Sequence, residues 1–357
     1  MTTDAACRES RAKGDADAAS TGAAASRVRI SGHGFGTAPI GNLYAEVGGD
    51  EAQMALDRAL QLGMRYFDSA PFYGHGLAER RLGRALAGVP RDRFAVSTKV
   101  GRRIERDPAQ RAPISDGFAV HGSRAVFDYS RDGIRLSFES SLRRLGLERV
   151  DILFLHDVGS LTHGADHPRI LRQALDEALP AMAALRAQGV VRAIGIGVNE
   201  IGVCRELMPR FDLDCIMLAG RYTLFEQATA LPMLDEAHRR GVRVIVAAPY
   251  NSGLLGDPHG PGKTYDYAPA GAGALKRAGQ IYAICHEEGI DVGAVALQFP
   301  LAHPAVCAVV AGMRNVMEVE STIARSSQRL PARVWRRLQA AGIIDAAAPV
   351  PAVDGTR

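Results

Sequence analysis

Short hydrophobic runs alternate with longer segments of helical periodicity along most of the chain. Runs of four to seven apolar residues bounded by Gly, Pro or polar clusters are typical of buried strands. Eight such strands are predicted: one leads into Gly34-Phe35-Gly36, and the others span residues 64–67, 94–98, 150–155, 193–196, 215–218, 242–247 and 306–310.

Helical periodicity fills most of the intervals between these strands, at residues 51–62, 79–86, 133–145, 169–188, 202–208, 225–239 and 317–325. Gly63, Gly146, Gly189 and Gly241 follow four of these helices and suit a left-handed cap. A region of this length with eight strand–helix repeats favours one α/β domain, a single (β/α)8 TIM barrel with long loops at its C-terminal face. A doubly wound sheet would have fewer strands or a second domain.

We therefore expect a barrel over residues 27–345, between a flexible N-terminal tail (1–26) and a C-terminal tail (346–357). The tail at 1–26 lacks the apolar core of a signal peptide. Three segments that follow strands are longer than ordinary connections, at 102–129, 157–168 and 250–272. Because barrels keep their active sites at this end, these segments are candidate substrate loops.

Composition narrows the class of protein. A hydrophobic content of 47% supports a packed core. The 43 Lys and Arg residues nearly balance the 39 Asp and Glu residues, and no basic cluster that would bind nucleic acid is present in the sequence. The Arg pairs at 102–103, 143–144 and 336–337 are interpreted as solvated faces. No apolar run reaches the length of a membrane helix. The five cysteines are scattered and form no CxxC pair, so we expect a cytoplasmic protein without disulfides.

Two other patterns point to sites but are incomplete. The glycines at 32, 34 and 36, and those at 195 and 197, do not complete a GxGxxG dinucleotide fingerprint. His156, His163 and His167, with Asp157 and Asp166, lack the spacing of a metal site on a helix, so no metal is predicted.

Three successive predicted strands each end in an ionisable residue: Asp68, Lys99 and His156. Tyr73 lies five residues beyond Asp68, close enough to turn back over the same end of a barrel. Each residue alone has an ordinary explanation, such as a turn cap, a solvated ammonium, a core histidine or a loop aromatic. Together, a carboxylate, an ammonium, an imidazole and a phenol indicate an acid–base site.

The chemistry these residues suit is proton transfer by a phenol. A free tyrosine has a pKa of about 10, and a neighbouring cation lowers it. Lys99 is predicted to be that cation, Asp68 to keep Lys99 charged and oriented, and His156 to hydrogen-bond the substrate oxygen. None of the four accepts a hydride, so a redox reaction at this site requires a cofactor.

These residues lie in segments that resemble the aldo-keto reductase superfamily. Residues 67–74 (FDSAPFYG) are similar to its FDTAxxYG motif, 97–100 (STKV) to its strand-end lysine and 151–156 (DILFLH) to its strand-end histidine. The match in order and spacing runs from Gly34 to Gly312. The resemblance implies a catalytic tetrad of Asp68, Tyr73, Lys99 and His156, with Tyr73 as general acid/base, and a cofactor that is NADP or NAD.

Further segments resemble the cofactor site of that family: 194–199 (IGIGVN), 218–222 (LAGRY), 248–255 (APYNSGLL) and 312–315 (GMRN). In these segments a Ser and a Gln of the family pattern are missing. The resemblance implies that Asn199 reaches the nicotinamide amide, Tyr222 stacks beneath the ring, and Arg314 or Glu318 decides between NADP and NAD. The implied cofactor residues are Gly36, Thr37, Asp68, Asn199, Tyr222, Pro249, Tyr250, Asn251, Ser252, Gly253, Leu254, Gly312, Met313, Arg314, Glu318 and Thr322.

Residues 195–200 and 218–224 are most similar to the sugar dehydrogenase branch of the superfamily, which includes L-fucose, D-threo-aldose and L-galactose dehydrogenases. This resemblance implies oxidation of an anomeric hydroxyl to a lactone. Pyridoxal oxidation, aldehyde reduction and a nicotinamide-sensing binding subunit remain alternatives, and monomer and homo-oligomer both remain open. Besides Tyr73 and His156, the residues proposed to contact a sugar are Tyr44, His121, Asp128, Tyr129, Asp157 and Arg221.

Overall fold

The computed structural model describes residues 30, 32–111, 117–257, 259–260 and 262–351. The predicted N-terminal tail, with Cys7, and residues 352–357 of the predicted C-terminal tail lie outside the described residues. The four cysteines that the structure describes are free thiols.

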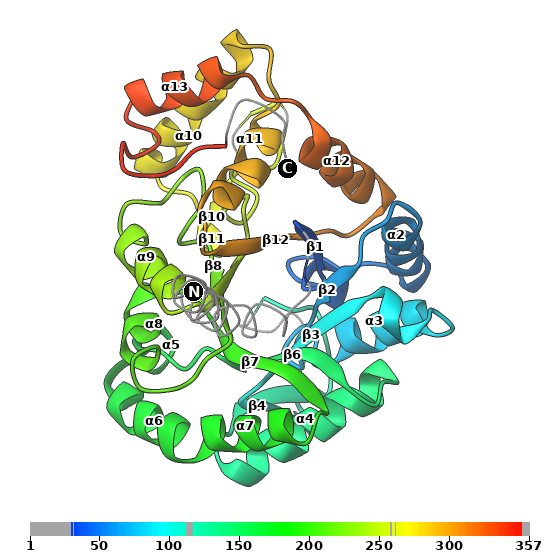
Figure 1. Ribbon diagram of the computed structural model, residues 1–357. Helices are drawn as coiled ribbons and strands as arrows, with labels where there is room; N and C mark the ends of the chain where they lie inside the picture. Colours follow the sequence, from blue (N-terminus) through cyan, green and yellow to red (C-terminus); the bar gives the residue numbers. More distant parts are fainter. Residues whose placement is uncertain (1–29, 31, 112–116, 258, 261, 352–357) are drawn as a thin grey trace, which may run out of the picture.

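Eight parallel strands close into a barrel in the order β1-β12-β9-β8-β7-β6-β3-β2, with the helices arranged around it (Figure 1). This confirms the predicted TIM barrel and all eight predicted strands. Their bounds are β1 His33–Gly36, β2 Tyr66–Asp68, β3 Ala95–Val100, β6 Val150–His156, β7 Val191–Val198, β8 Cys215–Ala219, β9 Arg243–Ala247 and β12 Val306–Gly312.

The helices of the outer layer follow the predicted order, and residues 169–188 are divided by a π-helical turn, η4 (Ala174–Ala178). The main helices are α2 Gly49–Gln61, α3 Leu77–Leu86, α4 Arg131–Leu145, α6 His167–Gln173, α7 Leu179–Ala187, α8 Ile201–Leu207, α9 Leu231–Arg239, α10 Ala272–Glu287, α11 Val292–Gln298, α12 Val316–Ser327 and α13 Ala332–Ala340. Short turns are η1 Pro39–Gly41, η2 Arg91–Arg93, α5 Ser160–His163, η3 Gly164–Asp166 and η5 Phe299–Ala302.

Two predictions about the helices were wrong or incomplete. The helix predicted from residue 225 begins at Leu231, because the Thr223 hydroxyl accepts hydrogen bonds from the amides of Phe225 and Glu226 and forms a turn instead. Helices α10, α11 and α13 were not predicted. Helix α10 is rich in Gly and Ala, so it gives little contrast between an apolar and a polar face.

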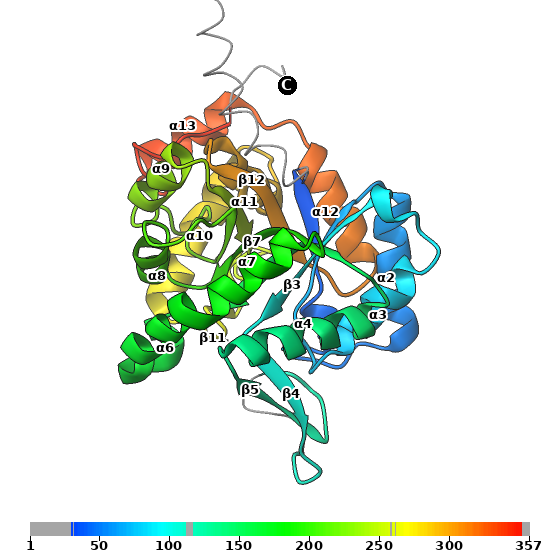
Figure 2. The same cartoon turned by 60° about the horizontal axis from the view of Figure 1, so that its bottom comes forward.

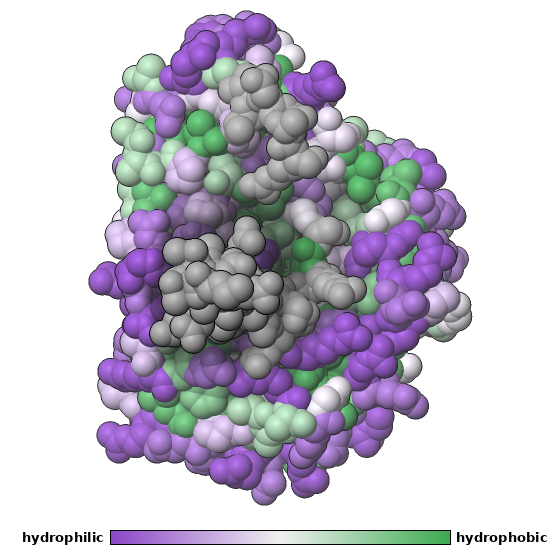
Figure 3. All heavy atoms as spheres, viewed as in Figure 1, coloured by the Kyte–Doolittle hydropathy of each residue, from purple (hydrophilic) through white to green (hydrophobic). Residues whose placement is uncertain are grey.

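Successive side chains along each strand point alternately into the barrel and out toward the helices, which gives two hydrophobic layers. Side chains pointing into the barrel form one cluster that includes Tyr66, Ile152, Phe154, Met217 and Ile245. The next residues along the same strands pack outward against the helices. In Figure 3, hydrophilic side chains cover much of the periphery, as expected for a ring of helices with one apolar face each. None of the helices formed by the described residues is long and apolar enough to cross a membrane.

The long loops carry structure of their own. The segment after β3 forms an antiparallel hairpin, β4 (Arg102–Arg106) with β5 (Ser123–Phe127), which projects from the body of the barrel in Figure 2. The segment after β9 contains a second, shorter hairpin, β10 (Thr264–Tyr265) with β11 (Ala268–Pro269). Both were predicted only as loops.

Candidate active site

The strand period places three of the four predicted catalytic side chains in the barrel mouth. Tyr66 points inward, so Asp68, two residues later, points inward as well. On β6, Phe154 points inward, so His156, two residues later at the end of the strand, points inward as well. Strands β2 and β3 align Asp68 with Ser97, and β3 and β6 align Lys99 with Phe154. The barrel therefore brings Asp68, Lys99 and His156 to one end.

A buried ion pair links two of these residues. The Lys99 ammonium donates to Asp68 Oδ2 at 2.7 Å and to the Ser69 carbonyl at 2.9 Å, and both charged side chains are at most 3% exposed. The Ser97 hydroxyl donates to Asp68 Oδ1 at 2.7 Å. A carboxylate this deeply buried requires these partners, because an unpaired charge there would cost several kcal/mol.

Tyr73 lies over this ion pair on the loop between β2 and α3. The Lys99 nitrogen is 4.6 Å from the centre of the Tyr73 ring, and the His156 ring meets it edge-on with centres 6.1 Å apart. The next residue, Gly74, has a φ of +61°, and a Cβ there would lie 2.2 Å from the Gly41 carbonyl oxygen. Only glycine fits that contact, which holds the loop against η1.

The predicted lowering of the Tyr73 pKa by Lys99 is wrong for this structure. Burial and the carboxylates of Asp68 and Asp157 raise the pKa of Tyr73 well above its ordinary value, and Arg102 acts weakly against them. The Lys99 ammonium forms an ion pair with Asp68 and faces the ring of Tyr73. The negative charge of Asp68 offsets the electrostatic effect of Lys99 on the Tyr73 hydroxyl. The phenol is therefore protonated at neutral pH in the protein alone.

His156 is buried beside a second charged pair that the sequence did not reveal. Arg102 donates to Asp157, whose carboxylate is 3.5 Å from His156 Nε2. The Arg102 guanidinium also stacks 3.8 Å from the centre of the Phe72 ring. Asp157 has a left-handed backbone with a φ of +49°, a conformation that costs energy in a non-glycine residue. The interpretation of Arg102 as solvated is wrong, since its side chain is 12% exposed.

Arg144, also interpreted as solvated, is 17% exposed and donates to the buried Glu79 at 2.6 Å. Glu79 accepts from the Thr98 hydroxyl as well. Adjacent arginines on one helix therefore have different environments, which their sequence does not distinguish.

The environment of His156 predicts a pH-dependent stability. Burial lowers the pKa of His156 from 6.5 to about 3; the Asp157 carboxylate acts against this shift, and Arg102 and Lys99 act with it. Between these values the unfolded chain binds the proton and the folded chain does not, so the fold loses stability as the pH falls. Lowering the pH from about 7.5 to about 5 should therefore reduce the free energy of unfolding by about 2 kcal/mol through His156.

Urea unfolding of the wild type and His156→Gln at these two pH values tests this prediction. The wild type should lose about 2 kcal/mol more than the variant on acidification. His33, whose pKa burial also lowers, to about 4, is present in both proteins and does not affect the difference. An identical loss in both proteins would contradict the buried, neutral state of His156.

The loop after β9 has the backbone expected of an anion site. Ala248, Asn251, Ser252 and Gly253 have φ values of +54°, +47°, +59° and +91°. Successive residues in left-handed conformations direct backbone amides to one side, which suits phosphate oxygens. The Asn251 Oδ1 atom is buried and has no hydrogen-bond partner among the described residues. These residues, with Pro249 and Leu254 beside them, fit the pyrophosphate role that the resemblance implies.

Other predicted cofactor residues lie around the same mouth. Gly36 ends β1, and the hydroxyl of the following residue, Thr37, donates to the Ser69 hydroxyl at 2.9 Å. Asn199 follows β7 directly. Tyr250 is packed within 5.6 Å of the Arg325 guanidinium on α12. The mouth therefore gathers residues from the ends of β1, β7 and β9.

Tyr222 does not join the other predicted cofactor residues. Its ring is fully buried against Phe299 and His303 of the outer layer, with ring centres 5.4 and 5.7 Å away. Its neighbour Arg221 points toward the mouth instead and donates to the Asn199 carbonyl at 2.6 Å. The structure thus places Tyr222 in the core, where it is not available to stack beneath a nicotinamide.

The residues predicted to bind the adenosine end lie at the β12–α12 junction. Gly312 ends β12, Met313 is buried, and Thr322 is buried on α12. The Arg314 guanidinium donates to Glu318 Oε1 at 2.6 and 3.0 Å, and the Arg314 amide donates to Glu318 Oε2 at 2.7 Å. The cation and the carboxylate therefore neutralise each other.

The predicted substrate residues differ in their access to the barrel mouth. Asp157 lies beside His156, and Tyr44 is 53% exposed. Tyr129, by contrast, is buried and donates its hydroxyl to the carbonyls of His156 and Asp157 at 2.8 and 3.0 Å.

The remaining substrate candidates are exposed or bonded within the protein. Asp128 accepts from the Ser130 hydroxyl and amide at the start of α4. His121 is exposed on the loop before β5. Arg221 donates to both oxygens of Asp266, at 2.8 and 2.9 Å. Of the six loop residues that were predicted, Asp157 and Tyr44 therefore have the better access to the mouth.

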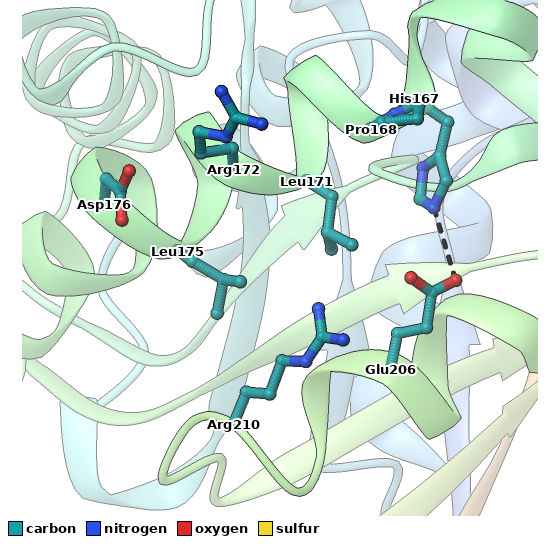
Figure 4. Close-up of a pocket in the computed structure, with 8 residues that line it drawn as sticks. All are labelled: His167, Pro168, Leu171, Arg172, Leu175, Asp176, Glu206 and Arg210. Atoms are coloured by element: carbon teal, nitrogen blue, oxygen red, sulfur yellow. Dashed lines mark hydrogen bonds and ion pairs between the residues drawn. The ribbon is translucent and has the colours of Figure 1, made fainter.

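A separate hollow of about 370 Å³ lies in the outer helical layer (Figure 4). Its lining residues are His167, Pro168, Leu171, Arg172, Leu175, Asp176, Glu206 and Arg210, and His167 contacts Glu206 at 3.3 Å. These residues belong to α6, η4, α8 and the turn after it, so the hollow contains none of the predicted catalytic side chains. Within the part of the chain that the structure describes, no three His, Cys, Asp or Glu side chains are grouped to hold a metal ion.

Comparison with known proteins agrees with this geometry. The model of the Aldo/keto reductase family matches residues 34–343. The chain is 38% identical over 330 residues to pyridoxal 4-dehydrogenase of Microbacterium luteolum, covering 89% of this chain and 95% of the relative. It is 38% identical over 328 residues to D-threo-aldose 1-dehydrogenase of a Pseudomonas species, covering 90% and 97%.

An aldo-keto reductase from Bacillus halodurans, solved in its holo form, superimposes with a TM-score of 0.69 at 25% identity, over 92% of this chain and 96% of that one. The family match spans nearly all of the barrel, and the two sequence relatives are similar along almost their whole length. The protein is therefore an oxidoreductase of the aldo/keto reductase family.

Proposed function

We propose that this protein is an NAD-dependent dehydrogenase that oxidises the anomeric hydroxyl of an aldose, of the L-fucose, D-threo-aldose or L-galactose type, to its lactone. The observation that carries the proposal is the grouping of Tyr73, His156 and Asp157 at one barrel mouth, above the buried Lys99–Asp68 pair. A phenol, a neutral imidazole and a carboxylate together offer the donors and acceptors that a sugar hydroxyl and its neighbours require.

The reaction removes a proton from the anomeric oxygen and a hydride from the carbon that bears it. A nicotinamide nucleotide held by the residues assigned to it would supply the hydride acceptor, and the positive charge of its oxidised form would favour loss of the phenol proton. Tyr73 first loses its own phenol proton to solvent and, as a phenolate, takes the proton of the hydroxyl. His156, neutral because burial lowers its pKa to about 3, donates a hydrogen bond to the same oxygen. The ion-paired Lys99 packs against the Tyr73 ring and holds it in place.

The Arg102–Asp157 pair supports a sugar as the substrate. Its carboxylate lies one residue from His156 and can accept from a second hydroxyl of the substrate, while Arg102 keeps it ionised and fixed. A polar ligand can hydrogen-bond to a charged pair at the mouth, whereas an apolar ligand would bury the pair without offering it any hydrogen bond. The relative that oxidises D-threo-aldoses, as its name states, is consistent with this choice.

The contacts of Glu318 favour NAD over NADP. Its carboxylate accepts three hydrogen bonds from Arg314, two of them from the guanidinium, so the positive charge that a 2′-phosphate would need is already neutralised. A carboxylate in this position repels a phosphate and suits the ribose hydroxyls.

Pyridoxal is a second candidate substrate. The Phe118 ring stacks beside Tyr73 with centres 6.1 Å apart, and Phe72 meets Phe118 edge-on at 5.1 Å. These rings form an aromatic wall that suits a pyridine ring. The Microbacterium luteolum relative bears the name of this activity.

A steady-state screen of aldoses and pyridoxal, each with NAD and with NADP, tests the proposal through the absorbance of the reduced nicotinamide. We expect aldose oxidation with NAD. Asp157→Asn, which retains the shape of the side chain, should lower kcat/KM for the aldose about 10- to 100-fold. Its effect on a simple aldehyde, reduced in the opposite direction, should be smaller. Turnover of pyridoxal without any aldose would reject the sugar assignment in favour of the second candidate.

A further inference from the structure

Asp157, the residue after β6, has a strained backbone at the active-site mouth. Its φ of +49° lies in the left-handed region, which costs free energy in a residue other than glycine. Because rotation about φ turns the side chain relative to β6, this conformation decides where the carboxylate points. The carboxylate accepts a hydrogen bond from Arg102 and lies 3.5 Å from His156 Nε2. Contacts with the surrounding chain must therefore compensate for the strain.

Two side chains from other segments bond the main chain of this turn. The Tyr129 hydroxyl lies 2.8 Å from the carbonyl oxygen of His156 and 3.0 Å from that of Asp157. His163 Nε2 lies 3.0 Å from the Asp157 carbonyl oxygen and 3.0 Å from the Tyr129 hydroxyl. Tyr129 precedes α4 and His163 ends α5, so one of the two lies on each side of the turn in sequence.

The acceptors in this network fix the positions of its hydrogens. A carbonyl oxygen can only accept, so the imidazole nitrogen beside the Asp157 carbonyl carries the hydrogen of that bond. His163 therefore donates from Nε2 to Asp157, and Tyr129 gives its one hydroxyl hydrogen to the nearer carbonyl, that of His156. Removing either donor leaves an acceptor of the turn short of a hydrogen bond.

Packing places Tyr129 independently of its hydroxyl. The side chain is 1% exposed, and its ring lies against Gly101, directly after β3, where a Cβ would be 2.6 Å from Tyr129 Cε1. The ring also stacks on Phe127 with centres 5.9 Å apart and meets the His163 ring edge-on at 5.4 Å. The substitution Tyr129→Phe therefore removes the hydrogen bond and leaves the ring in place.

Strand β7 holds the beginning of the turn without help from these two side chains. His156 pairs with Gly197 in the ladder of β6 and β7, and the Asp157 amide donates to the Gly197 carbonyl at 3.0 Å. Loss of the Tyr129 or His163 bond should therefore leave His156 in place. Its effect should fall on the carboxylate of Asp157.

We propose that Tyr129 and His163 are positioning residues of the substrate site, whose hydrogen bonds hold the left-handed turn that directs the Asp157 carboxylate to the substrate. The inference rests on the proposed function, because it assigns Asp157 to a hydroxyl of the aldose. Tyr129, predicted to contact the sugar, acts on it through Asp157 instead. Weakening the turn reduces binding of the polyhydroxylated substrate and leaves proton transfer at Tyr73 unchanged.

Steady-state kinetics with L-fucose, or the best aldose of the screen, and with propionaldehyde in the opposite direction tests the proposal. Tyr129→Phe should raise KM for the aldose about 3- to 10-fold and change kcat less than about 2-fold, with no effect on propionaldehyde, which has no hydroxyl. His163→Leu should act in the same way. His163→Gln, whose amide nitrogen can donate from nearly the place of Nε2, should restore the wild-type KM.

Tyr282→Phe is the matched control, because its hydroxyl also donates to a backbone carbonyl, that of Asp257, and its KM should not change. The Asp157→Asn background separates positioning from a general disturbance. There, Tyr129→Phe should raise KM much less, since the carboxylate that it positions is already gone. Equal increases in both backgrounds would overturn the proposal, as would an unchanged KM or an equal loss of kcat for both substrates.

A crystal structure of Tyr129→Phe/His163→Leu distinguishes this inference from the proposed function. Without both donors, Asp157 should leave the left-handed region and its carboxylate should move away from Arg102. If both features persisted, the inference would be wrong, whatever the enzyme oxidises. A wild type that oxidises no aldose would reject the sugar assignment alone, and the structure of the double variant would still decide whether Tyr129 and His163 position Asp157.

Discussion

Tyr73→Phe should lower the rate of aldose oxidation by about 10²- to 10⁴-fold, the contribution usual for a general acid or base. The change removes one oxygen and leaves the ring, so the contacts with Lys99, His156 and Phe118 remain. The fold and the affinity for the dinucleotide should therefore stay as in the wild type. Steady-state rates and a calorimetric titration with NAD measure the two effects separately.

Tyr282→Phe is the matched control for this variant. It makes the same chemical change on α10, where the hydroxyl donates to the Asp257 carbonyl and contacts none of the predicted catalytic residues. Its turnover should equal that of the wild type. If Tyr73→Phe also retained wild-type turnover, another group would have to move the proton, and the assignment of Tyr73 would be wrong.

Lys99→Met should both destabilise the fold and abolish turnover. Methionine replaces the lysine side chain as far as its ε carbon but leaves Asp68, which is 2% exposed, without its cation. Breaking a buried pair by removing one partner costs about 3 to 5 kcal/mol, because the remaining charge stays buried. Urea unfolding measures the loss of stability, and the oxidation rate of the fraction that remains folded measures the catalytic effect.

The double variant Asp68→Asn/Lys99→Met separates the two effects. It removes both charges, so most of the lost stability should return, and the Ser97 hydroxyl can still donate to the amide oxygen at position 68. Turnover should remain lost, because the Tyr73 ring no longer has the ammonium beside it. A double variant as unstable as Lys99→Met would show that the ion pair is not the source of the instability, and one with restored turnover would show that Lys99 is dispensable.

The parts of the site that could be predicted from sequence depend on strand position. Asp68, Lys99 and His156 were assigned to strand ends because each follows a short apolar run. In a parallel barrel every strand end faces the same side, so position along the chain translates directly into position in the mouth. Helix α10 gives little contrast between an apolar and a polar face, and α11 is apolar almost throughout. Helix α13 was not predicted although Val334, Trp335 and Leu338 form an apolar face at helical spacing.

The parts that could not be predicted depend on side chains that meet across distant segments. Arg102 has the same sequence context as a solvated arginine, and only its contact with Asp157 and Phe72 brings it to the site. Tyr222 matches a family pattern, yet its ring turns into the core against Phe299. The resemblance named the residue and could not fix the direction of its side chain.

The sequence by itself thus determined the barrel, the order of its strands and the membership of Asp68, Tyr73, Lys99 and His156 in one mouth, because strand periodicity and motif spacing are local properties of the chain. Only the tertiary structure decided the charge states in that mouth and the residues that complete it. The raised pKa of Tyr73, the lowered pKa of His156 and the Arg102–Asp157 pair all follow from burial and from contacts between segments far apart in sequence.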